Sequence, residues 1–452
     1  MRKRNYILIL GMVGAFATTA QTSPYTGSMP PTEGSADFYL YQVESGKWLS
    51  ENRAKGGTWT TRAELGKPGL DVEIIKVEGG YRINPKLNGN HSINGNNLWM
   101  DTGDKATVWE FTPVEVEGVD NAVLITAVSG PGDGYPHALG TGNDGFLSTN
   151  APEDKKTWQL VSPEDRAAYM TANAGEADAT WLIPWQDFGR NNERSASWTL
   201  KHADDGSSIG HNGIQRNAIR EAWNNARSYM HYTTLTGIPN GTYEVRVQGY
   251  QRENWDASST WGRYNAGIAP QRAYYFAGDA SHPLMNIADE QFTGDIKPSD
   301  HQWEKIAAIG RWIPNSMDAA SYIFDTGRYY NPWIKTVVTD GTLTLGILKL
   351  EGSERDWLIY DNFEMRYVSE STEGAGTGNL QDEVNALVES LDKYPANKPE
   401  TVVNAIENVK TAANAIELRK AHMDLISALG TYIPATIGTF HDISALAENE
   451  GI

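Results

Sequence analysis

The feature that most constrains this chain is a strict alternation of apolar and polar side chains near its middle. Within residues 237–250, three apolar residues alternate with three polar ones: Tyr243, Val245 and Val247 with Glu244, Arg246 and Gln248. Successive side chains of a strand point to opposite faces of its sheet, so a period of two predicts a strand buried on one face. The turn residues Pro239, Asn240 and Gly241 precede the alternation. The chain is therefore expected to contain a sheet packed on one side against a core.

A second strand-like run covers residues 340–367, and the segment between the two runs is rich in Trp, Tyr, Gly and Asn. The first run opens with Gly-x-Pro-Asn-Gly-x-Tyr at residues 237–243, and the second contains Trp-x-x-x-Asp-Asn-Phe at residues 357–363. Together these motifs resemble the galactose-binding-like jelly-roll modules of proteins secreted by Bacteroides-type bacteria. The resemblance covers residues 177–368 and implies a jelly-roll β-sandwich, assigned to residues 176–369, of the carbohydrate-binding-module kind.

Residues 37–161 carry a weak internal repeat of about 42 residues. Strand-like openings recur at residues 38–41, 81–83 and 123–125, and the closing elements lie at residues 70–72, 109–111 and 158–160. Three such units predict a β-trefoil-like domain, and they resemble ricin-type trefoils. The repeats of that family end in Gln-x-Trp, whereas neither Trp109 nor Trp158 has Gln two residues before it. The sugar pockets of that family therefore cannot be assigned to positions in this chain.

The hydrophobic period changes after the second run. Residues 370–379 are rich in Gly, Ser and Thr and are predicted to be a flexible linker. In residues 380–430 apolar side chains recur at helical spacing, with Pro395 and Pro399 as breaks, which predicts a small three-helix module. A shorter helix is expected at residues 162–172, with Ser162 as N-cap. The predicted fold class is mainly β and multidomain: a β-trefoil-like domain, a jelly-roll β-sandwich and the C-terminal helical module.

The first twenty residues have the pattern of a signal peptide. Arg2, Lys3 and Arg4 precede an apolar stretch at residues 6–16 and small residues at 18–20. We therefore expect export, with the protein secreted, periplasmic or at the cell surface. The apolar stretch is shorter than the roughly 20 residues of a membrane-spanning helix, so no integral membrane segment is predicted. The sequence contains no Cys, which excludes disulfides, thiol catalysis and Cys-ligated metals.

The charge of the chain constrains its partners. Lys and Arg number 38 against 57 Asp and Glu, giving a formal net charge of −19. Nucleic acid is not an expected partner because phosphate binding needs basic patches. Anionic polysaccharides are disfavoured by the same repulsion, whereas neutral glycans are not. No motif for a nucleotide or other organic cofactor is present, and the sequence does not indicate an oligomeric state.

Two clusters of aromatic and polar residues in predicted loops are the candidate carbohydrate-binding residues. Proteins bind sugars with aromatic rings against the C–H faces and polar side chains on the hydroxyl groups. If the loops gather at one end of the sandwich, the two clusters form one surface; the alternative is that several rings fill the core. The candidates are Arg252, Asn254, Trp255, Trp261, Arg263 and Tyr264 in the first cluster, and Arg328, Tyr329, Tyr330, Asn331 and Trp333 in the second.

Asp361 is the one charged residue in the apolar phase of the last strand, which it shares with Trp357, Ile359, Phe363 and Met365. A regular strand would bury its carboxylate, and a buried charge needs partners. One interpretation is a β-bulge or hydrogen bonds from backbone amides. The other is a structural calcium ion with Asp361 as a ligand, because calcium prefers oxygen ligands.

The leading hypothesis is an exported, non-catalytic carbohydrate-binding protein that captures a polysaccharide or glycan by aromatic stacking in the sandwich loops. Two alternatives stay open. The first is a glycoside hydrolase or lyase that acts in the sandwich cleft and uses a pair of carboxylates, whose separation the sequence does not reveal. The second is a cell-surface adhesion or structural protein whose aromatic residues pack between modules.

Overall fold

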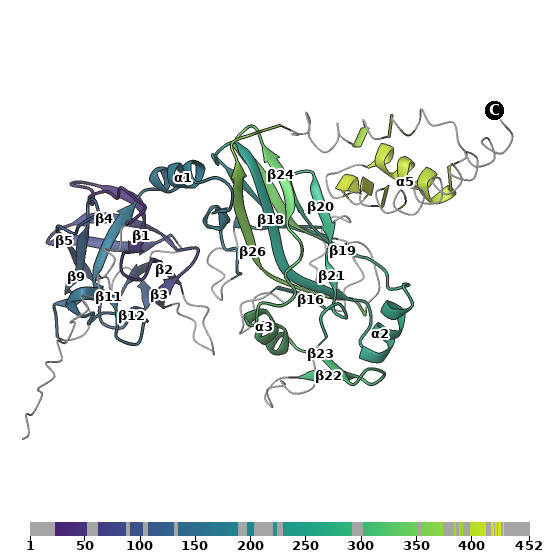
Figure 1. The fold of residues 1–452 in the computed structure, drawn as a ribbon, viewed down its shortest axis with the longest axis horizontal. Helices are drawn as coiled ribbons and strands as arrows, with labels where there is room; N and C mark the ends of the chain where they lie inside the picture. Colours follow the sequence, from purple (N-terminus) through teal and green to yellow (C-terminus); the bar gives the residue numbers. More distant parts are fainter. Residues whose placement is uncertain are drawn as a thin grey trace, which may run out of the picture.

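The computed structural model describes residues 23–51, 62–86, 91–102, 107–130, 134–188, 197–202, 220–223, 229–291, 302–349 and 355–373, together with parts of 384–428. The fold is mainly β, with several sheets and a few helices (Figure 1). The predicted signal peptide at residues 1–20 lies outside the described residues. No helix in the described ranges is both long enough and apolar enough to cross a membrane.

The N-terminal body is built around a closed ring of six strands. Each strand pairs antiparallel with the next, and the last returns to the first through Leu160 opposite Leu40. Val72, Trp109 and Trp158 lie inside the ring and are completely buried. In ring order the strands are β1 (Ser35–Gln42), β4 (Asp71–Val77), β5 (Gly80–Pro85), β8 (Val108–Pro113), β9 (Val123–Ser129) and β13 (Thr157–Val161).

Short hairpins separate the ring strands. The openings of the sequence repeat lie on β1, β5 and β9, and its closings lie on or at the start of β4, β8 and β13. Each repeat thus supplies two ring strands with a hairpin between them. The hairpin strands are β2 (Lys47–Glu51) with β3 (Ala63–Gly66), β6 (His91–Ile93) with β7 (Met100–Thr102), and β11 (Gly140–Thr141) with β12 (Leu147–Ser148), while β10 (His137–Ala138) pairs with β9.

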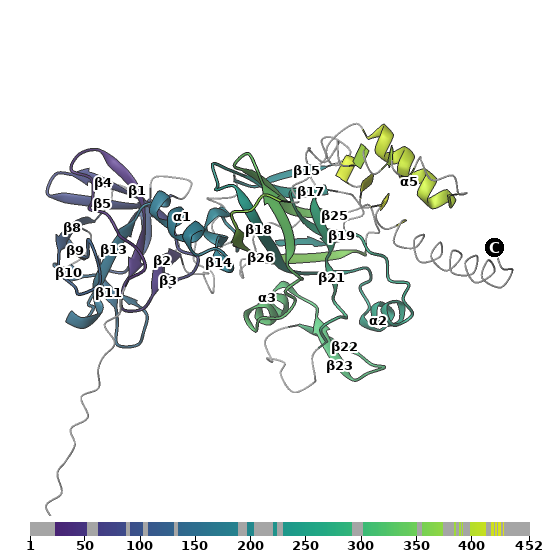
Figure 2. The same ribbon diagram turned by 45° about the horizontal axis from the view of Figure 1, so that its top comes forward.

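Helix α1 (Pro163–Ala172) connects the ring to the next body and lies between the two in both views (Figures 1 and 2). The Oγ of Ser162 accepts a hydrogen bond of 3.0 Å from the backbone N–H of Asp165, and Pro163 is the first helical residue. The predicted N-cap is thereby confirmed. Strand β14 (Ala177–Asp178) and the short helix η3 (Thr180–Leu182) follow.

The middle body is a sandwich of two sheets. Tyr243, Val245 and Val247 are completely buried between them, together with Leu345 and Tyr275, so the alternation predicts the buried face correctly. One sheet contains β14, β26 (Trp357–Ser369), β18 (Gly241–Arg252), β21 (Met285–Asn286), β16 (Arg220–Trp223) and β24 (Ile334–Val338). The other contains β15 (Thr199–His202), β17 (Tyr229–Thr236), β25 (Thr342–Lys349), β19 (Ala273–Ala277) and β20 (Ala280–Pro283).

A small cap covers one end of the sheet that contains β18 and β26. It consists of α2 (Ala257–Asn265), α3 (Met317–Asp325) and the hairpin of β22 (Trp303–Ile306) with β23 (Arg311–Pro314), which lie together at the lower end in Figure 1. The cap has a core of its own, which includes Tyr250, Ile287, Phe324, Tyr329 and Trp357. We call this group the cap core.

The C-terminal body contains α5 (Glu400–Thr411), whose residues Val402, Ile406 and Val409 pack with helical residues on either side of it. This body contacts the sandwich through Arg419, whose Nη2 donates a hydrogen bond of 2.7 Å to the carbonyl of Gly278. The Arg419 guanidinium carbon also lies 4.1 Å from the centroid of the Phe276 ring. The helical body therefore packs on the sandwich beside β19. Residues 374–379 of the predicted linker lie outside the described ranges.

Candidate functional site

The structure does not gather the predicted carbohydrate-binding residues on one surface, and Tyr329 shows why. Its ring is completely buried in the cap core, and its hydroxyl lies 2.7 Å from the backbone oxygens of both Ile287 and Glu290. Burial raises the pKa of this hydroxyl well above its usual value. The prediction that Tyr329 binds sugar is wrong, because its ring offers no exposed face.

Arg252 is also a structural residue. Only 2% of its side chain is exposed, and its guanidinium group donates to the Oε2 of Glu304 at 2.5 Å and to the Oδ1 of Asn315 at 2.9 Å. Further bonds reach the backbone oxygens of Asn254 and Trp255. The prediction of a ligand contact is corrected here: Arg252 uses its donors to hold the cap on the end of β18.

The candidates on α2 face different surroundings. Trp261 is half-buried and packs against the cap core, with its ring centroid 5.7 Å from that of Tyr264. A hydrogen bond with Asp289, followed by burial, raises the pKa of Tyr264 to about 12. Arg263 is exposed and donates to the carbonyl of Ile268 at 3.3 Å. These side chains mainly stabilise the cap.

The two candidate asparagines, Asn254 and Asn331, form hydrogen bonds with backbone groups. The Oδ1 of Asn254 accepts a hydrogen bond of 3.2 Å from the backbone N–H of Asp256, next to the start of α2. Asn331 is buried, and its Nδ2 donates to the carbonyls of Val247 at 3.0 Å and Gly249 at 2.9 Å. Asn331 is therefore not available to a ligand, which corrects its place among the candidates.

Two further candidates lie near the cap. The Trp255 side chain is 52% exposed, and the guanidinium carbon of Arg355 lies 5.5 Å from its ring centroid. Arg328 is half-buried, and its backbone oxygen accepts a hydrogen bond of 2.8 Å from the Nε2 of Gln248. Among the first cluster, Trp255 alone presents a largely exposed aromatic ring.

Asp361 is completely buried, as its phase predicts. The register between β18 and β26 shifts at this point, because Arg246 pairs with Glu364 whereas Gln248 pairs with Asp361. The Asp361 Oδ1 accepts a hydrogen bond of 2.8 Å from the backbone N–H of Asn362, which has a φ of 48°. The bulge interpretation is confirmed. Within the described ranges no three His or acidic side chains converge, so this part of the chain supplies no side-chain cluster for the calcium ion suggested at Asp361.

Tyr330 and Trp333 differ from the other candidates, because both rings lie against arginines of β18 and β26. The guanidinium carbon of Arg246 lies 4.1 Å from the centroid of the Tyr330 ring and 4.4 Å from that of the Trp333 ring. The guanidinium carbon of Arg366 lies 4.5 Å from the Trp333 ring. Distances under about 6 Å allow cation–π attraction, which fixes the Trp333 ring in place.

Carboxylates complete this arrangement. The Nε of Arg246 donates to Glu364 at 2.7 Å, and the Nε of Arg366 donates to Glu244 at 2.6 Å. The hydroxyl of Tyr330 donates to the other oxygen of Glu364 at 2.7 Å. Burial, followed by this hydrogen bond, raises the pKa of Tyr330 above its usual value. Tyr330 is therefore neutral at physiological pH and uses its hydroxyl proton within the protein.

A pocket of about 440 Å³ lies beside Trp333, at the junction between the ring and the sandwich. We call it the Trp333 pocket. The sandwich and the segment that leads into it supply Glu176, Asp178, Thr180, Gln186, Asp187, Trp333, Asn362, Phe363, Glu364, Met365 and Arg366. The ring of strands supplies Ser50, Glu64, Gly66, Lys67 and Pro68. Among the lining residues that the structure describes, five carboxylates face two basic groups, so the local potential disfavours anionic ligands.

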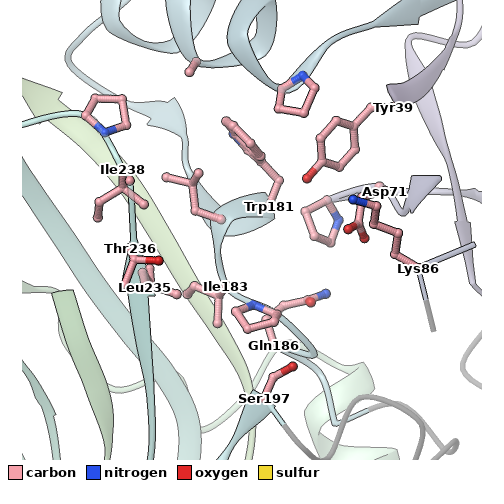
Figure 3. A pocket seen from close by; sticks show the side chains of 18 of the residues that line it. Tyr39, Asp71, Lys86, Trp181, Ile183, Gln186, Ser197, Leu235, Thr236 and Ile238 are labelled. Carbon is pink, nitrogen blue, oxygen red and sulfur yellow. The ribbon is translucent and has the colours of Figure 1, made fainter. Parts of the chain in front are cut away.

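A second pocket of about 650 Å³, which we call the Trp181 pocket, lies at the same junction (Figure 3). Trp181 and Tyr39 both line it and lie next to each other, with ring centroids 5.4 Å apart. Asp71 and Lys86 of the ring form one side. The sandwich supplies Leu235, Thr236 and Ile238 on the opposite side, and Ile183, Gln186 and Ser197 lie between the two sides in this view.

Arg166 of α1 fixes the junction that forms both pockets. Its side chain is buried, and its guanidinium carbon lies 4.4 Å from the Tyr39 ring, 4.0 Å from the Trp48 ring and 4.8 Å from the Trp181 ring. Its Nη2 also donates to the backbone oxygen of Pro68. Burial lowers the pKa of Arg166 to about 10, so the group is still charged at neutral pH. One cation thus joins rings from both bodies.

The sequence predicts Tyr330 and Trp333 as candidate residues but does not single out the arginines and carboxylates around them. Arg246, Glu364 and Arg366 occupy the polar phase of β18 and β26, which was the available signal for an outward-facing cluster. Residues of the N-terminal ring of strands, such as Lys67, also line the pocket beside Trp333, and no local sequence signal predicts this.

No protein-family model matches the chain, and no curated protein matches it by sequence. Among solved structures, the chain is similar to one described as TmCBM61 in complex with β-1,4-galactotriose. The identity is 13%, the match covers 41% of this chain and 97% of that chain, and the TM-score is 0.23. A likeness this distant establishes neither the fold nor the function of this chain.

Proposed function

We propose that this chain is an exported, non-catalytic protein that binds a neutral glycan in the Trp333 pocket. The observation that carries the proposal is the half-buried Trp333 ring, fixed by Arg246 and Arg366 at the wall of a pocket otherwise rich in hydrogen-bonding side chains. An aromatic ring accepts the apolar face of a pyranose, and the polar groups around it accept and donate to its hydroxyls. The volume is within the range of small-molecule sites.

The lining also favours an uncharged ligand over an anionic one. Asn362 and Gln186 carry amide groups that both donate and accept, and Asp178 and Asp187 carry acceptors for sugar hydroxyls. The excess of carboxylates repels sulfated or uronic-acid chains. A neutral polysaccharide or host glycan has the hydroxyl groups for these hydrogen bonds and lacks the negative charge that would be repelled.

We further propose specific folds for the three bodies, and export of the chain. The closed ring of six strands with three hairpins supports a β-trefoil for residues 37–161. The two facing sheets support a jelly-roll sandwich for residues 176–369. The packing of α5 with its neighbours supports the three-helix module. Arg2, Lys3 and Arg4 followed by an apolar stretch support export.

The test is calorimetric titration of the full chain with neutral polysaccharides, namely galactan, xylan, mannan, β-glucan and starch. Trp333→Ala should abolish saturable binding, because it removes the stacking surface. Trp255→Ala is the matched control, since it removes an exposed Trp ring at the cap, away from the Trp333 pocket, and should leave the affinity unchanged.

Three outcomes would overturn the proposal. The first is that the wild-type chain binds none of the five polysaccharides. The second is that Trp333→Ala binds as tightly as the wild type. The third is release of new reducing ends by the chain, which would favour the hydrolase alternative over a non-catalytic binder.

A further inference from the structure

The Trp333 pocket and the Trp181 pocket adjoin each other. Pro68 of the ring and Gln186 of the sandwich line both. The two pockets therefore meet at these residues and run along the same junction. Both pockets thus have walls from the ring and from the sandwich.

The Trp181 pocket repeats the chemistry of the Trp333 pocket. Each has a partly buried Trp at its wall, Trp181 in one and Trp333 in the other. The Trp181 pocket adds hydrogen-bonding groups from Asp71, Lys86 and Thr236. Lys86 is also paired with Asp37, and its side chain is 42% exposed, so its charge is partly neutralised. Both halves of the junction thus combine an aromatic ring with polar side chains.

Arg166 links the two sides of the junction. Its guanidinium group contacts Tyr39 and Trp48 on the ring side and Trp181 on the sandwich side. Thr180, next to Trp181, is in turn tied to β26, since its Oγ1 lies 3.1 Å from the backbone oxygen of Met365. A site whose walls are fixed before binding loses less conformational entropy when the ligand arrives.

We propose that the two pockets form one continuous groove, in which the ring and the sandwich together hold a single linear, uncharged glycan chain. This inference rests on the proposed function of the Trp333 pocket. One segment of the glycan lies against Trp333, and a later segment of the same chain lies in the Trp181 pocket. Once the first segment is bound, the second binds at a high effective concentration, so the affinity rises with chain length.

The test measures affinity against chain length by calorimetry on the full chain. The probes are β-1,4-galacto-, xylo- and manno-oligosaccharides, each from the disaccharide to the hexasaccharide. Thr236→Trp narrows the Trp181 pocket from an exposed position of β17. This change avoids Trp181 itself, because that ring also contacts Arg166. Thr112→Trp is the matched control, because Thr112 is an exposed strand residue of β8 that lines neither pocket.

For the wild type, the hexasaccharide of at least one series should bind at least about tenfold more tightly than the disaccharide. Thr236→Trp should remove that gain and leave disaccharide binding unchanged, whereas Thr112→Trp should change neither. If Thr236→Trp binds the hexasaccharide as tightly as the wild type does, the single-groove inference is wrong and the Trp333 site stands. If Trp333→Ala retains binding of every length, the proposed function fails as well.

Discussion

The guanidinium carbon of Arg366 lies 4.5 Å from the centroid of the Trp333 ring, and the same Arg366 is held by the carboxylates of Glu244 and Glu176. Trp333 precedes β24, whereas Arg366 lies on β26. The Trp333 ring therefore lies against a charged network on the sheet as well as being held by the loop that carries it. The orientation of Trp333 thus depends on side chains of two strands, β18 and β26.

Arg366→Gln should weaken glycan binding by about two- to fivefold, which corresponds to a cation–π contribution of about 0.5–1 kcal/mol at a partly exposed site. Stability should change by less than about 1 kcal/mol, because surface ion pairs contribute little. Calorimetry gives the affinity and urea unfolding gives the stability. Arg311→Gln, the same change at an exposed arginine of β23, is the control. Unchanged affinity in Arg366→Gln would contradict the positioning role.

Tyr329→Phe should destabilise the protein by about 1–2 kcal/mol, because the buried backbone oxygens of Ile287 and Glu290 lose their hydroxyl partner. Glycan affinity should not change, since Tyr329 belongs to the cap core. Thermal unfolding and calorimetric titration measure the two effects separately. A large loss of affinity with unchanged stability would return Tyr329 to the binding site.

Acid should destabilise the C-terminal helical body through His422. Burial, followed by the nearby charge of Arg419, lowers the pKa of His422 to about 4 in the folded chain. The unfolded chain takes up this proton near the ordinary His pKa of about 6.5, so stability is lost as the pH falls from about 6.5 towards 4. The loss approaches about 3 kcal/mol at the low end.

Urea unfolding followed by helical circular dichroism, at about pH 7.5 and about pH 4.5, measures this loss. His422→Gln removes the titrating group and should lose less stability between the two pH values than the wild type does. An equal loss in both proteins would mean that other groups cause the acid sensitivity.

Arg166→Met should loosen the junction between the ring and the sandwich. The variant keeps much of the side-chain volume but loses a desolvated cation–π contact, which is worth about 2 kcal/mol. Small-angle X-ray scattering should show a larger radius of gyration, and the Tm should fall. Arg311→Met is the control for the loss of an exposed arginine. Scattering identical to that of the wild type would show that Arg166 does not hold the two bodies together.

Local signals in the sequence predict local structure well. The alternation around Val245 defines the buried face of β18, the hydroxyl of Ser162 caps α1, and the repeat spacing matches the ring strands. The phase of Asp361 predicts its burial, but the bulge at this position depends on the pairing of β26 with β18. Strand partners are set by the tertiary fold, so the sequence of one strand does not choose between the two interpretations.

The site itself was less predictable, because residues adjacent in the sequence lie in different environments, one in a core and the next on the sheet surface. Tyr329, with a φ of 60°, enters the cap core, whereas Tyr330 lies against Arg246 on the sheet. Composition alone does not separate these two rings. The walls of the junction also join residues far apart in the chain, such as Lys67 and Asn362, and only the packing of the two bodies brings them together.

The most direct test of the central claim is a crystal structure of the full chain with a bound neutral oligosaccharide that calorimetry has shown to bind. We predict a sugar ring against Trp333, within hydrogen-bonding distance of Asn362 or Gln186, with the rest of the chain directed towards the Trp181 pocket. A sugar bound instead beside Trp255 and Arg355, with the junction empty, would contradict the account.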